Sequence, residues 1–395
     1  MRPLLIALLF MTAHAHAQCL TEACVARLLG VDADNIEAIV PLSQDERPEN
    51  TVILQGNVKE GRFKVSEHTL VPAHPPSASP VPVPPPRAGR AASGKAGPRA
   101  TWIWHAADWL QDGAALLAWA RGEKLGQLYI TVPTDAHGVR DHAALARFVR
   151  QAHRLHIAIW SVDGDPHMAL PTEHAAAARL AQAYLDYNRT SPPDARLDGI
   201  QFDVEPYLLP DDGSSATELN ARYLAMVHTL RKAAGTLKLE FVVPFWWSDR
   251  ADLLAALARD ADSLMVMDYR TDPEQVVEFA APFLDWAQSN GKSVRIALEA
   301  GPIAAETQRR YHPTDGPADL MAVQADGKQI LVALRAPAAV PEGVKGYRLG
   351  GTRELDGSAT TFARDLDKLH ALVPVLEKRF SAWPGFAGMA VHGLR

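Results

Sequence analysis

Two carboxylates stand at alternating positions of one short stretch, Leu197-Asp-Gly-Ile-Gln-Phe-Asp-Val-Glu-Pro206. As a strand, this stretch places its apolar residues on one side and its polar residues, which end with Asp203 and Glu205, on the other. Pro206 ends the strand just after the second acid. Paired carboxylates of this kind can act as a general acid and its partner, as in a glycosidase. A solvated acidic edge would give the same pattern, so the surrounding elements must distinguish the two.

From residue 100 to the end of the chain, strand-like and helix-like stretches alternate. The predicted strands are Thr101–His105, Gln127–Val132, Ile157–Val162, Gly199–Glu205, Leu239–Pro244, Leu264–Tyr269, Val294–Glu299 and Gly388–His392. The predicted helices, with apolar residues three and four apart, are Ala114–Arg121, Asp141–Leu155, Thr172–Asn188, Ala216–Ala234, Ala251–Asp260, Pro273–Ser289 and Thr361–Arg379. This alternation over roughly 295 residues predicts an α/β fold, a (β/α)₈ TIM barrel, whose chemistry lies where the strands end. A doubly wound open sheet is the competing fold, but the sequence lacks the Gly-rich first turn typical of it.

The seventh predicted strand adds a third acid to the same rim. Arg295 and Glu299 share one face of this strand, and a charged face cannot lie in the layer that the helices cover. We therefore expect both side chains to point into the barrel, with Glu299 across its mouth from Glu205. The alternative is that Glu299 is a structural partner of the inward-pointing Arg295.

The stretch from Leu197 to Glu205 resembles the fourth-strand signature of the chitinase-like family 18 glycoside hydrolases, an Asp-Gly followed by acids at alternating positions and a terminal Glu. Met267-Asp268-Tyr269 resembles the Met-x-Tyr of that family's sixth strand. The family usually has an acid, an Asp and a floor tryptophan at three positions where this chain has, in order, Gln201, Arg270 and His392. The resemblance covers the barrel only and suggests a distant member of this superfamily.

The resemblance implies a role for each acid. Glu205 would be the general acid that protonates the glycosidic oxygen. Asp203 would raise the pKa of Glu205 by like-charge repulsion and orient a substrate amide, while Tyr269 would steady the intermediate. The nucleophile in the family is an acetamido group of the substrate. In the other assignment Glu299 is the nucleophile and Glu205 the acid/base, as in conventional retaining glycosidases, and the residues leave both open.

Aromatic and polar side chains follow several predicted strand ends and are suited to binding a sugar. Indole rings stack on the apolar faces of sugars, while the sugar hydroxyls need polar partners. The candidate substrate-binding residues are Trp102, Trp104, Trp160, Trp246, Trp247, Tyr207, Asp163, Asp268 and His392. Buried core positions for the tryptophans, and loop caps for Asp163, Asp165 and Asp249, are the alternatives.

The chain before the barrel divides into three segments. Residues 1–17 have the features of a signal peptide: positive charge at Arg2, an apolar run from Leu4 to Met11 and the cleavage site Ala15-His16-Ala17. Residues 18–71 form a small N-terminal module, and residues 72–99 form a Pro-rich linker. The elements predicted in the module are a helix, Thr21–Leu29, and two strands, Thr51–Gln55 and Arg62–Ser66.

The barrel domain spans residues 100–395 and carries an insertion at residues 301–360. Within the insertion, Leu320–Val323 and Gln329–Leu334 flank an Asp-Gly turn and predict a hairpin. The only cysteines, Cys19 and Cys24, could close a small disulfide loop in an oxidising compartment. If they lie in one helix, their side chains diverge instead.

The composition and motifs of the chain bear on which molecules it can bind. The net charge of −6 gives no support to nucleic-acid binding, which requires a basic surface. The apolar run at the N-terminus is too short to span a bilayer, so we expect no stable membrane insertion after signal cleavage and a periplasmic or secreted protein. None of the 15 histidines has metal-site spacing, and we expect no metal and no cofactor.

The sequence therefore predicts an exported glycoside hydrolase that acts on an oligo- or polysaccharide. Fold alone does not determine activity, so two alternatives stay open. The barrel could bind carbohydrate without catalysis. The chain could also be an envelope scaffold that contacts other proteins through its N-terminal module.

Overall fold

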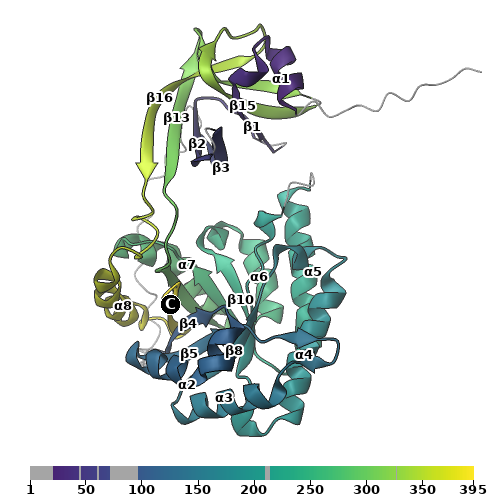
Figure 1. Ribbon diagram of the computed structural model, residues 1–395, viewed down its shortest axis with the longest axis vertical. Helices are drawn as coiled ribbons and strands as arrows, with labels where there is room; N and C mark the ends of the chain where they lie inside the picture. The colour runs from purple at the N-terminus through teal and green to yellow at the C-terminus, as the bar shows by residue number, and fades with distance from the viewer. Residues whose placement is uncertain (1–20, 44–45, 60–61, 72–96, 210–213, 326) are drawn as a thin grey trace, which may run out of the picture. The chain divides into compact units, whose positions relative to one another are not determined.

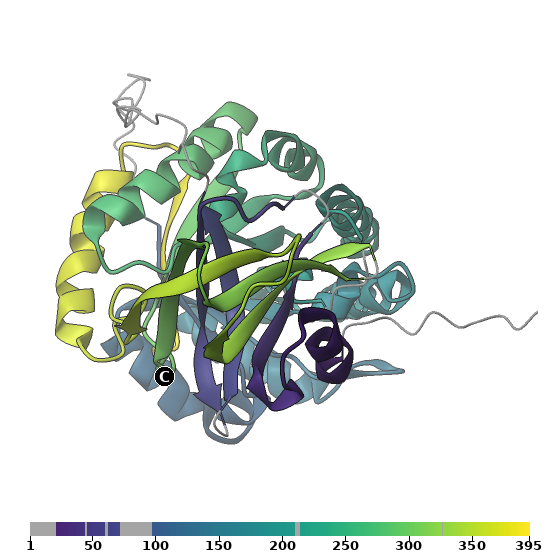
Figure 2. The same ribbon diagram turned by 90° about the horizontal axis from the view of Figure 1, so that it is seen from above.

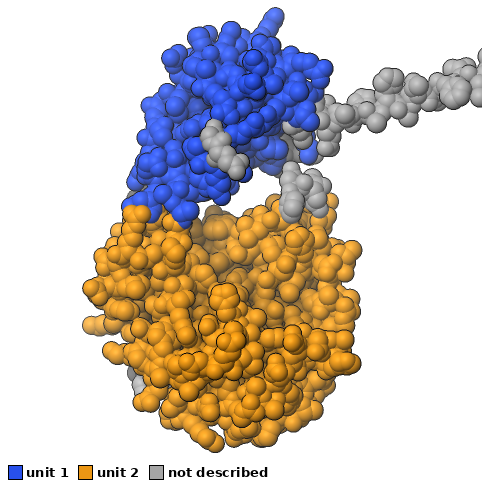
Figure 3. Space-filling model, in the orientation of Figure 1, with its two compact units in different colours: residues 1–81, 304–356 blue, residues 82–303, 357–395 orange. Residues whose placement is uncertain are grey.

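The computed structural model describes residues 21–43, 46–59, 62–71, 97–209, 214–325 and 327–395. The chain forms two compact units, one of residues 1–81 with 304–356 and one of residues 82–303 with 357–395 (Figure 3). The predicted signal peptide (1–17), Cys19 and most of the predicted linker (72–99) lie outside the described residues. No helix in the described ranges has both the length and the apolar composition needed to cross a membrane.

The larger unit is a closed barrel of parallel strands (Figures 1 and 2). In order around the barrel, the strands are β10 (Leu239–Pro244), β11 (Ser263–Met267), β12 (Ser293–Glu299), β17 (Phe386–His392), β4 (Arg99–Ile103), β5 (Leu125–Ile130), β8 (Ala158–Asp163) and β9 (Gly199–Phe202). Every neighbouring pair is parallel. The predicted TIM barrel is confirmed, and the carboxyl ends of all its strands meet at one rim.

Helices surround the strands (Figure 2). They are α2 (Ala106–Gly122), α3 (His142–Arg154), α4 (His174–Thr190), α5 (Ala216–Ala234), α6 (Ala251–Asp260), α7 (Pro273–Asn290) and α8 (Leu366–Phe380). A short hairpin of β6 (Thr134–Asp135) and β7 (Gly138–Val139) precedes α3. Ile200, Phe202 and Val204 are buried in the apolar layer between strands and helices, as their alternation predicts.

Polar side chains fill part of the barrel interior below the rim. The Glu240 carboxylate accepts hydrogen bonds from the Gln201 amide at 2.7 Å and the Ser263 hydroxyl at 2.9 Å, and also from the Tyr129 hydroxyl. Arg295 points inward as predicted and donates to Gln127 at 3.0 Å and to the carbonyl oxygens of Pro98 and Met389. Arg295 Nε has no partner among the described residues, and none of these contacts involves Glu299, so Arg295 is not the hydrogen-bond partner of Glu299.

The smaller unit is a seven-stranded antiparallel sheet in the order β1-β15-β14-β16-β13-β2-β3 (Figure 1). Its strands are β1 (Ile36–Pro41), β2 (Thr51–Lys59), β3 (Arg62–Val71), β13 (Glu306–Thr314), β14 (Ala318–Ala325), β15 (Lys328–Ala338) and β16 (Lys345–Leu355). Helix α1 (Glu22–Leu29) packs Val25, Ala26 and Leu29 against β14 and β15. Cys24 in this helix is disulfide-bonded.

Residues 18–71 and the insertion 301–360, which the sequence-based prediction treats as separate segments, build this one sheet together. Strand β1 pairs with β15, and β2 pairs with β13. Side chains from both segments share one apolar cluster, which includes Val52 and Phe63 from the first and Tyr311 and Tyr347 from the second. Joining the segments buries apolar faces that each would otherwise expose to water.

Candidate functional site

Asp203 and Glu205 follow directly after the last residue of β9. The backbone N–H of Asp203 donates to the carbonyl oxygen of Asp163, at the end of the neighbouring strand β8, at 2.8 Å. Gly164 comes so close to this segment that a Cβ there would lie 1.9 Å from the Asp203 carbonyl oxygen. The two strand ends are therefore fixed to each other at the rim, which holds both acids in place.

The carboxyl group of Asp203 is buried at the mouth of the barrel. Burial, followed by the charge of Glu205, raises the pKa of Asp203 to about 7, while the charge of His392 acts in the opposite direction. Its Oδ1 atom is buried and has no hydrogen-bond partner among the described residues. With a pKa of about 7, Asp203 is protonated in roughly half of the molecules at neutral pH, so the Asp203–Glu205 pair can hold the proton that a general acid requires.

Glu205 is held by a tyrosine two residues further along. The short helix Pro206–Leu208 turns the chain so that the Tyr207 hydroxyl donates to Glu205 Oε2. Burial and then this hydrogen bond raise the pKa of Tyr207 above its usual value, so it remains a donor. The Tyr207 ring packs edge-on against Trp246, with ring centroids 5.3 Å apart.

Glu299 is buried and both of its oxygens are engaged. Oε1 accepts the backbone N–H of Gly301 at 2.5 Å, and Oε2 lies 2.7 Å from His392 Nδ1. The indole N–H of Trp104 can only donate, and it lies 3.0 Å from His392 Nε2. In the neutral form of His392, Nε2 therefore accepts, and Nδ1 carries the proton that is donated to Glu299.

Tyr269 and His392 connect the two sides of the mouth. Their rings stack with centroids 6.2 Å apart. Burial, then Glu299, Asp203 and Glu205 raise the pKa of Tyr269 well above its usual value. Burial alone would lower the pKa of His392, but the hydrogen bond to Glu299 and the charges of the same three acids raise it. The predicted catalytic residues therefore converge on one place.

The candidate tryptophans divide into two groups. Trp104 and Trp246 are 39% and 45% exposed and can offer a ring face to a sugar. Trp102 is buried inside the barrel, where it stacks on Tyr129 with ring centroids 5.4 Å apart. Trp160 is also buried inside the barrel, and Trp247 is buried among the outer helices. Trp102, Trp160 and Trp247 are therefore core residues, because almost none of their side-chain surface is open to a ligand.

The candidate aspartates also differ in exposure. Asp163 accepts a hydrogen bond from the buried Tyr184 hydroxyl, and burial raises the pKa of Asp163 to about 6 against this bond. Asp268 has no exposed surface, and burial raises its pKa to about 8 against the charge of Arg270. Asp165 caps the short helix that follows it by accepting the N–H of His167, as a loop cap does.

The structure adds Glu240, which the sequence analysis does not single out, as a supporting residue. Gln201 Oε1 accepts the indole N–H of Trp102 at 2.6 Å, and the Gln201 amide donates to Glu240. The Trp102 ring in turn packs edge-on against His392, with centroids 5.6 Å apart. Glu240 could have been identified from the sequence, because it is the charged residue in the apolar run of β10 and the alternation of side chains places it inside the barrel.

In the part of the chain that the structure describes, no group of three or more His, Cys, Asp or Glu side chains is arranged to hold a metal ion. The acids of the mouth instead hydrogen-bond to Tyr207, His392 and the Gly301 N–H.

Among the solved structures similar to this chain are three glycoside hydrolases. A GH18 chitinase from Cycas revoluta in complex with (GlcNAc)4 has a TM-score of 0.40 and 12% identity over 75% of this chain and 94% of that chain. A class V chitinase from Nicotiana tobaccum in complex with NAG4 has a TM-score of 0.39 and 13% identity over 75% and 93%. An endo-beta-N-acetylglucosaminidase from Cordyceps militaris has a TM-score of 0.36 and 14% identity over 53% and 69%. Neither a protein-family model nor a curated protein matches the chain.

Proposed function

We propose that this chain is a glycoside hydrolase in which Glu205 is the general acid. The observation that carries the proposal is the Asp203–Glu205 pair at the barrel rim, in which the pKa of Asp203 is raised to about 7 beside Glu205. A carboxyl pair that retains a proton near neutral pH can supply it to a leaving group. Trp104 and Trp246, exposed after the first and fifth strands, are suited to hold sugar rings.

The contacts of Glu299 favour a substrate nucleophile over a protein nucleophile. A carboxylate that attacks a sugar must be open to the sugar ring, whereas the Glu299 side chain is buried and each of its oxygens already accepts a hydrogen bond. We therefore propose a substrate with a 2-acetamido group, whose carbonyl oxygen attacks C1 of the sugar. Glu299 then acts as a positioning residue that orients His392.

The proposed reaction has two steps. In the first, Glu205 gives its proton to the glycosidic oxygen, the C1–O bond breaks, and the acetamido oxygen forms a bond to C1. In the second, Glu205 takes a proton from a water molecule, whose oxygen attacks C1 and releases the acetamido group. The product keeps its anomeric configuration. We further propose that the protein acts outside the cytoplasm, in the periplasm or as a secreted enzyme, because of its signal-like N-terminus.

The test compares oligosaccharides with and without 2-acetamido groups, with product release followed by mass spectrometry. We expect hydrolysis of the acetamido sugars alone. Because Gln cannot donate the proton, Glu205→Gln should lower kcat by about 10²–10⁴-fold. Calorimetric binding of the same oligosaccharide should be retained, since the side-chain shape is conserved.

Glu278→Gln is the matched control, because Glu278 is exposed on the outside of α7 and should turn over at the wild-type rate. Equal turnover by wild type and Glu205→Gln would contradict the assignment. Binding of the sugars without any product from the wild type would instead identify a carbohydrate-binding barrel without catalysis.

A further inference from the structure

The outer face of β13 and β16 in the smaller unit is open to solvent and rich in arginine. These two strands pair side by side (Figure 1). Tyr311 and Tyr347 point into an apolar core of the sheet, so the residues that alternate with them point to the opposite face. Helix α1 packs on that opposite face over β14 and β15. Over β13 and β16 the same face is exposed at Arg310, Arg348 and Arg353.

The register of the two strands places these arginines in three successive rows. The paired residues in the rows are His312 with Arg348, Arg310 with Gly351, and Gln308 with Arg353. Arg348 and Arg353 share a face although they are an odd number of positions apart, because a bulge at Gly350 adds one residue to β16. Successive rows lie about 7 Å apart along the strands, since a strand rises about 3.3 Å per residue. The face therefore carries one cation in each row.

The three arginines have no acidic partner within the chain. Arg309, which points to the other face of β13, forms an ion pair with Glu37 at 2.6 Å. Arg310, Arg348 and Arg353 are exposed and form no ion pair with any residue that the structure describes. A guanidinium group can bind a carboxylate through two parallel N–H bonds. These three groups are therefore available to an anionic ligand.

The nearby acids are bound to other groups or lie further away. Glu306 accepts hydrogen bonds from side chains of β2 and β3 at 2.6 and 2.8 Å. Asp319 of β14 accepts the backbone N–H of Leu349 at 2.9 Å. Glu67 of β3 is separated from Arg353 by β2 and β13. The face over β13 and β16 is thus positively charged, although the whole chain has a net charge of −6.

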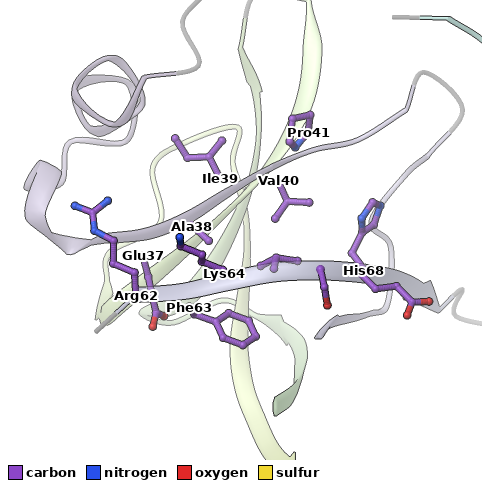
Figure 4. Close-up of a pocket in the computed structure, with 12 residues that line it drawn as sticks. Glu37, Ala38, Ile39, Val40, Pro41, Arg62, Phe63, Lys64 and His68 are labelled. Carbon is purple, nitrogen blue, oxygen red and sulfur yellow. The ribbon is translucent and has the colours of Figure 1, made fainter. Parts of the chain in front are cut away.

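A cavity in the same unit differs from this face in its charge. The cavity, of about 450 Å³, lies beside β1 and β3 (Figure 4). Its lining combines Glu37 and Glu67 with Arg62 and Lys64, so it does not favour a ligand of one sign. Only the arginine face has the uniform charge that selects an anion.

The neutral residues among the arginines suit a polymer that lies flat. Thr51 Oγ1 lies 3.2 Å from His312 Nδ1, and both groups can also hydrogen-bond to hydroxyls. Opposite Arg310, Gly351 leaves open space, because no atom lies within 4 Å of a Cβ there. The residues of the three rows on β2, β13 and β16 are Thr51, Ile53, Gln55, Gln308, Arg310, His312, Arg348, Gly351 and Arg353. They include no Phe, Tyr or Trp on which a nucleic-acid base could stack, and a single large apolar side chain, too few to enter a membrane.

We propose that the face formed by Arg310, Arg348 and Arg353 binds a linear polysaccharide that carries carboxylate groups. The guanidinium groups pair with carboxylates along the polymer, and the neutral side chains between them bind sugar hydroxyls. The choice of a polysaccharide among polyanions rests on the proposed function of the barrel, whereas the anionic character of the ligand rests on the smaller unit alone.

The test measures binding of the full chain to polygalacturonate by calorimetry, with carboxyl-reduced polygalacturonate as the neutral matched polymer. We expect the acidic polymer alone to bind, and its affinity to fall as the salt concentration rises. Replacement of Arg310, Arg348 and Arg353 together by Gln should weaken binding by at least about tenfold, because three charge-assisted contacts are lost. Each single Arg→Gln variant should weaken it by about two- to fivefold.

The matched control replaces three exposed arginines of the barrel helices, Arg121, Arg154 and Arg179, by Gln and should bind like the wild type. Thermal melting checks that both triple variants are folded, and the single variants decide if the first is not. Equal binding by the two triple variants, no binding of polygalacturonate, or tighter binding of a single-stranded oligonucleotide or of anionic lipid vesicles would each overturn the proposal. Polygalacturonate has no acetamido group, so its binding is independent of turnover. A failure of the proposed function appears separately, as the absence of product from acetamido oligosaccharides.

Discussion

The three acids at the mouth of the barrel, Asp203, Glu205 and Glu299, differ in the groups that contact their carboxyl oxygens. Glu299 is tied to His392 and to a backbone N–H, whereas Asp203 has a buried oxygen without a partner and Glu205 is bound by a tyrosine. Burial without a hydrogen-bond partner favours the neutral form of a carboxyl, which is the direction in which the pKa of Asp203 is shifted. These contacts are consistent with the proposed roles, proton transfer for the Asp203–Glu205 pair and positioning for Glu299.

Substitution of Glu299 separates the two assignments of the nucleophile. Glu299→Gln keeps an acceptor for the Gly301 N–H but places an amide opposite His392 Nδ1. If Glu299 only orients His392, loss of one hydrogen bond of about 1 kcal/mol should lower kcat/KM roughly tenfold or less. Steady-state kinetics on an acetamido oligosaccharide checks this. A loss of kcat/KM as large as that caused by Glu205→Gln, together with recovery of turnover when azide is added and a glycosyl azide is formed, would instead identify Glu299 as the nucleophile.

The raised pKa of Asp203 predicts how activity depends on pH. The carboxyl pair holds its proton below a pKa of about 7 and loses it as the pH rises. Since the proton is needed for general-acid catalysis, kcat/KM should fall as the pH rises through about 7. Asp203→Asn removes one member of the pair, so the pH at which kcat/KM begins to fall should change. Measurement of kcat/KM between pH 5 and 9 in both proteins checks the prediction, and an unchanged fall in Asp203→Asn would exclude Asp203 as its source.

At the scale of elements, the fourth strand is placed by close contacts that only glycine permits. Gly199 begins β9 and pairs with Trp160 of β8. A Cβ at Gly199 would lie 2.4 Å from the Trp160 ring, which is itself buried in the barrel interior. The indole of Trp160 therefore fills the space that a side chain at Gly199 would need. This packing sets the distance between β8 and β9 below Asp203 and Glu205.

Gly199→Ala should destabilise the barrel, because the buried ring of Trp160 must shift to make room for the added methyl group. Overpacking of a core of this kind costs about 1–3 kcal/mol in the free energy of unfolding. Urea denaturation checks the value. Gly122→Ala is the matched control, since no atom lies within 4 Å of a Cβ there and its stability should be close to wild type. A wild-type midpoint for Gly199→Ala would show that β8 and β9 separate without cost.

The barrel strands could be predicted from the sequence because each combines an apolar run with a polar turn, and parity correctly placed Arg295 and Glu299 inside. The position of Trp247 could not be predicted in this way. It lies in the short helix Phe245–Asp249 after β10, and no local period determines which way such a turn directs its side chains. Its contact with Tyr223 comes from a different helix.

At the scale of the whole molecule, the sequence predicts α1, β2, β3 and the hairpin of β14 and β15, but not that they belong to one sheet, because this sheet joins residues far apart in the chain. Strand β16 contains glycines and charges instead of a clear alternation, and β1 is short. Strand β16 belongs to the sheet through its pairing with β13 and β14, and the N-terminal strands join it through the pairing of β1 with β15 and of β2 with β13. Such long-range pairing depends on the folded chain and leaves little signal in any local window.

This shared sheet predicts how each segment depends on the other. A chain that begins at residue 97 lacks α1, β1, β2 and β3, so β15 and β13 each lose a paired neighbour. The insertion would then expose Leu331, Tyr311 and other side chains of its apolar core. We expect this truncated chain to bind the dye ANS and to be cleaved by trypsin within residues 304–356, because an open apolar sheet is not stable in water.

The barrel should be unaffected, since its strands and helices all lie in residues 97–303 and 357–395. A second variant, which starts at residue 97 and also replaces residues 304–356 by a short Gly-Ser linker, is the matched control. It should melt cooperatively and bind little ANS, because the exposed sheet is gone. If the first variant resists trypsin and binds no more ANS than the full chain, the insertion folds alone. In that case the N-terminal strands add to a sheet that is already stable, and the two segments are not one folding unit.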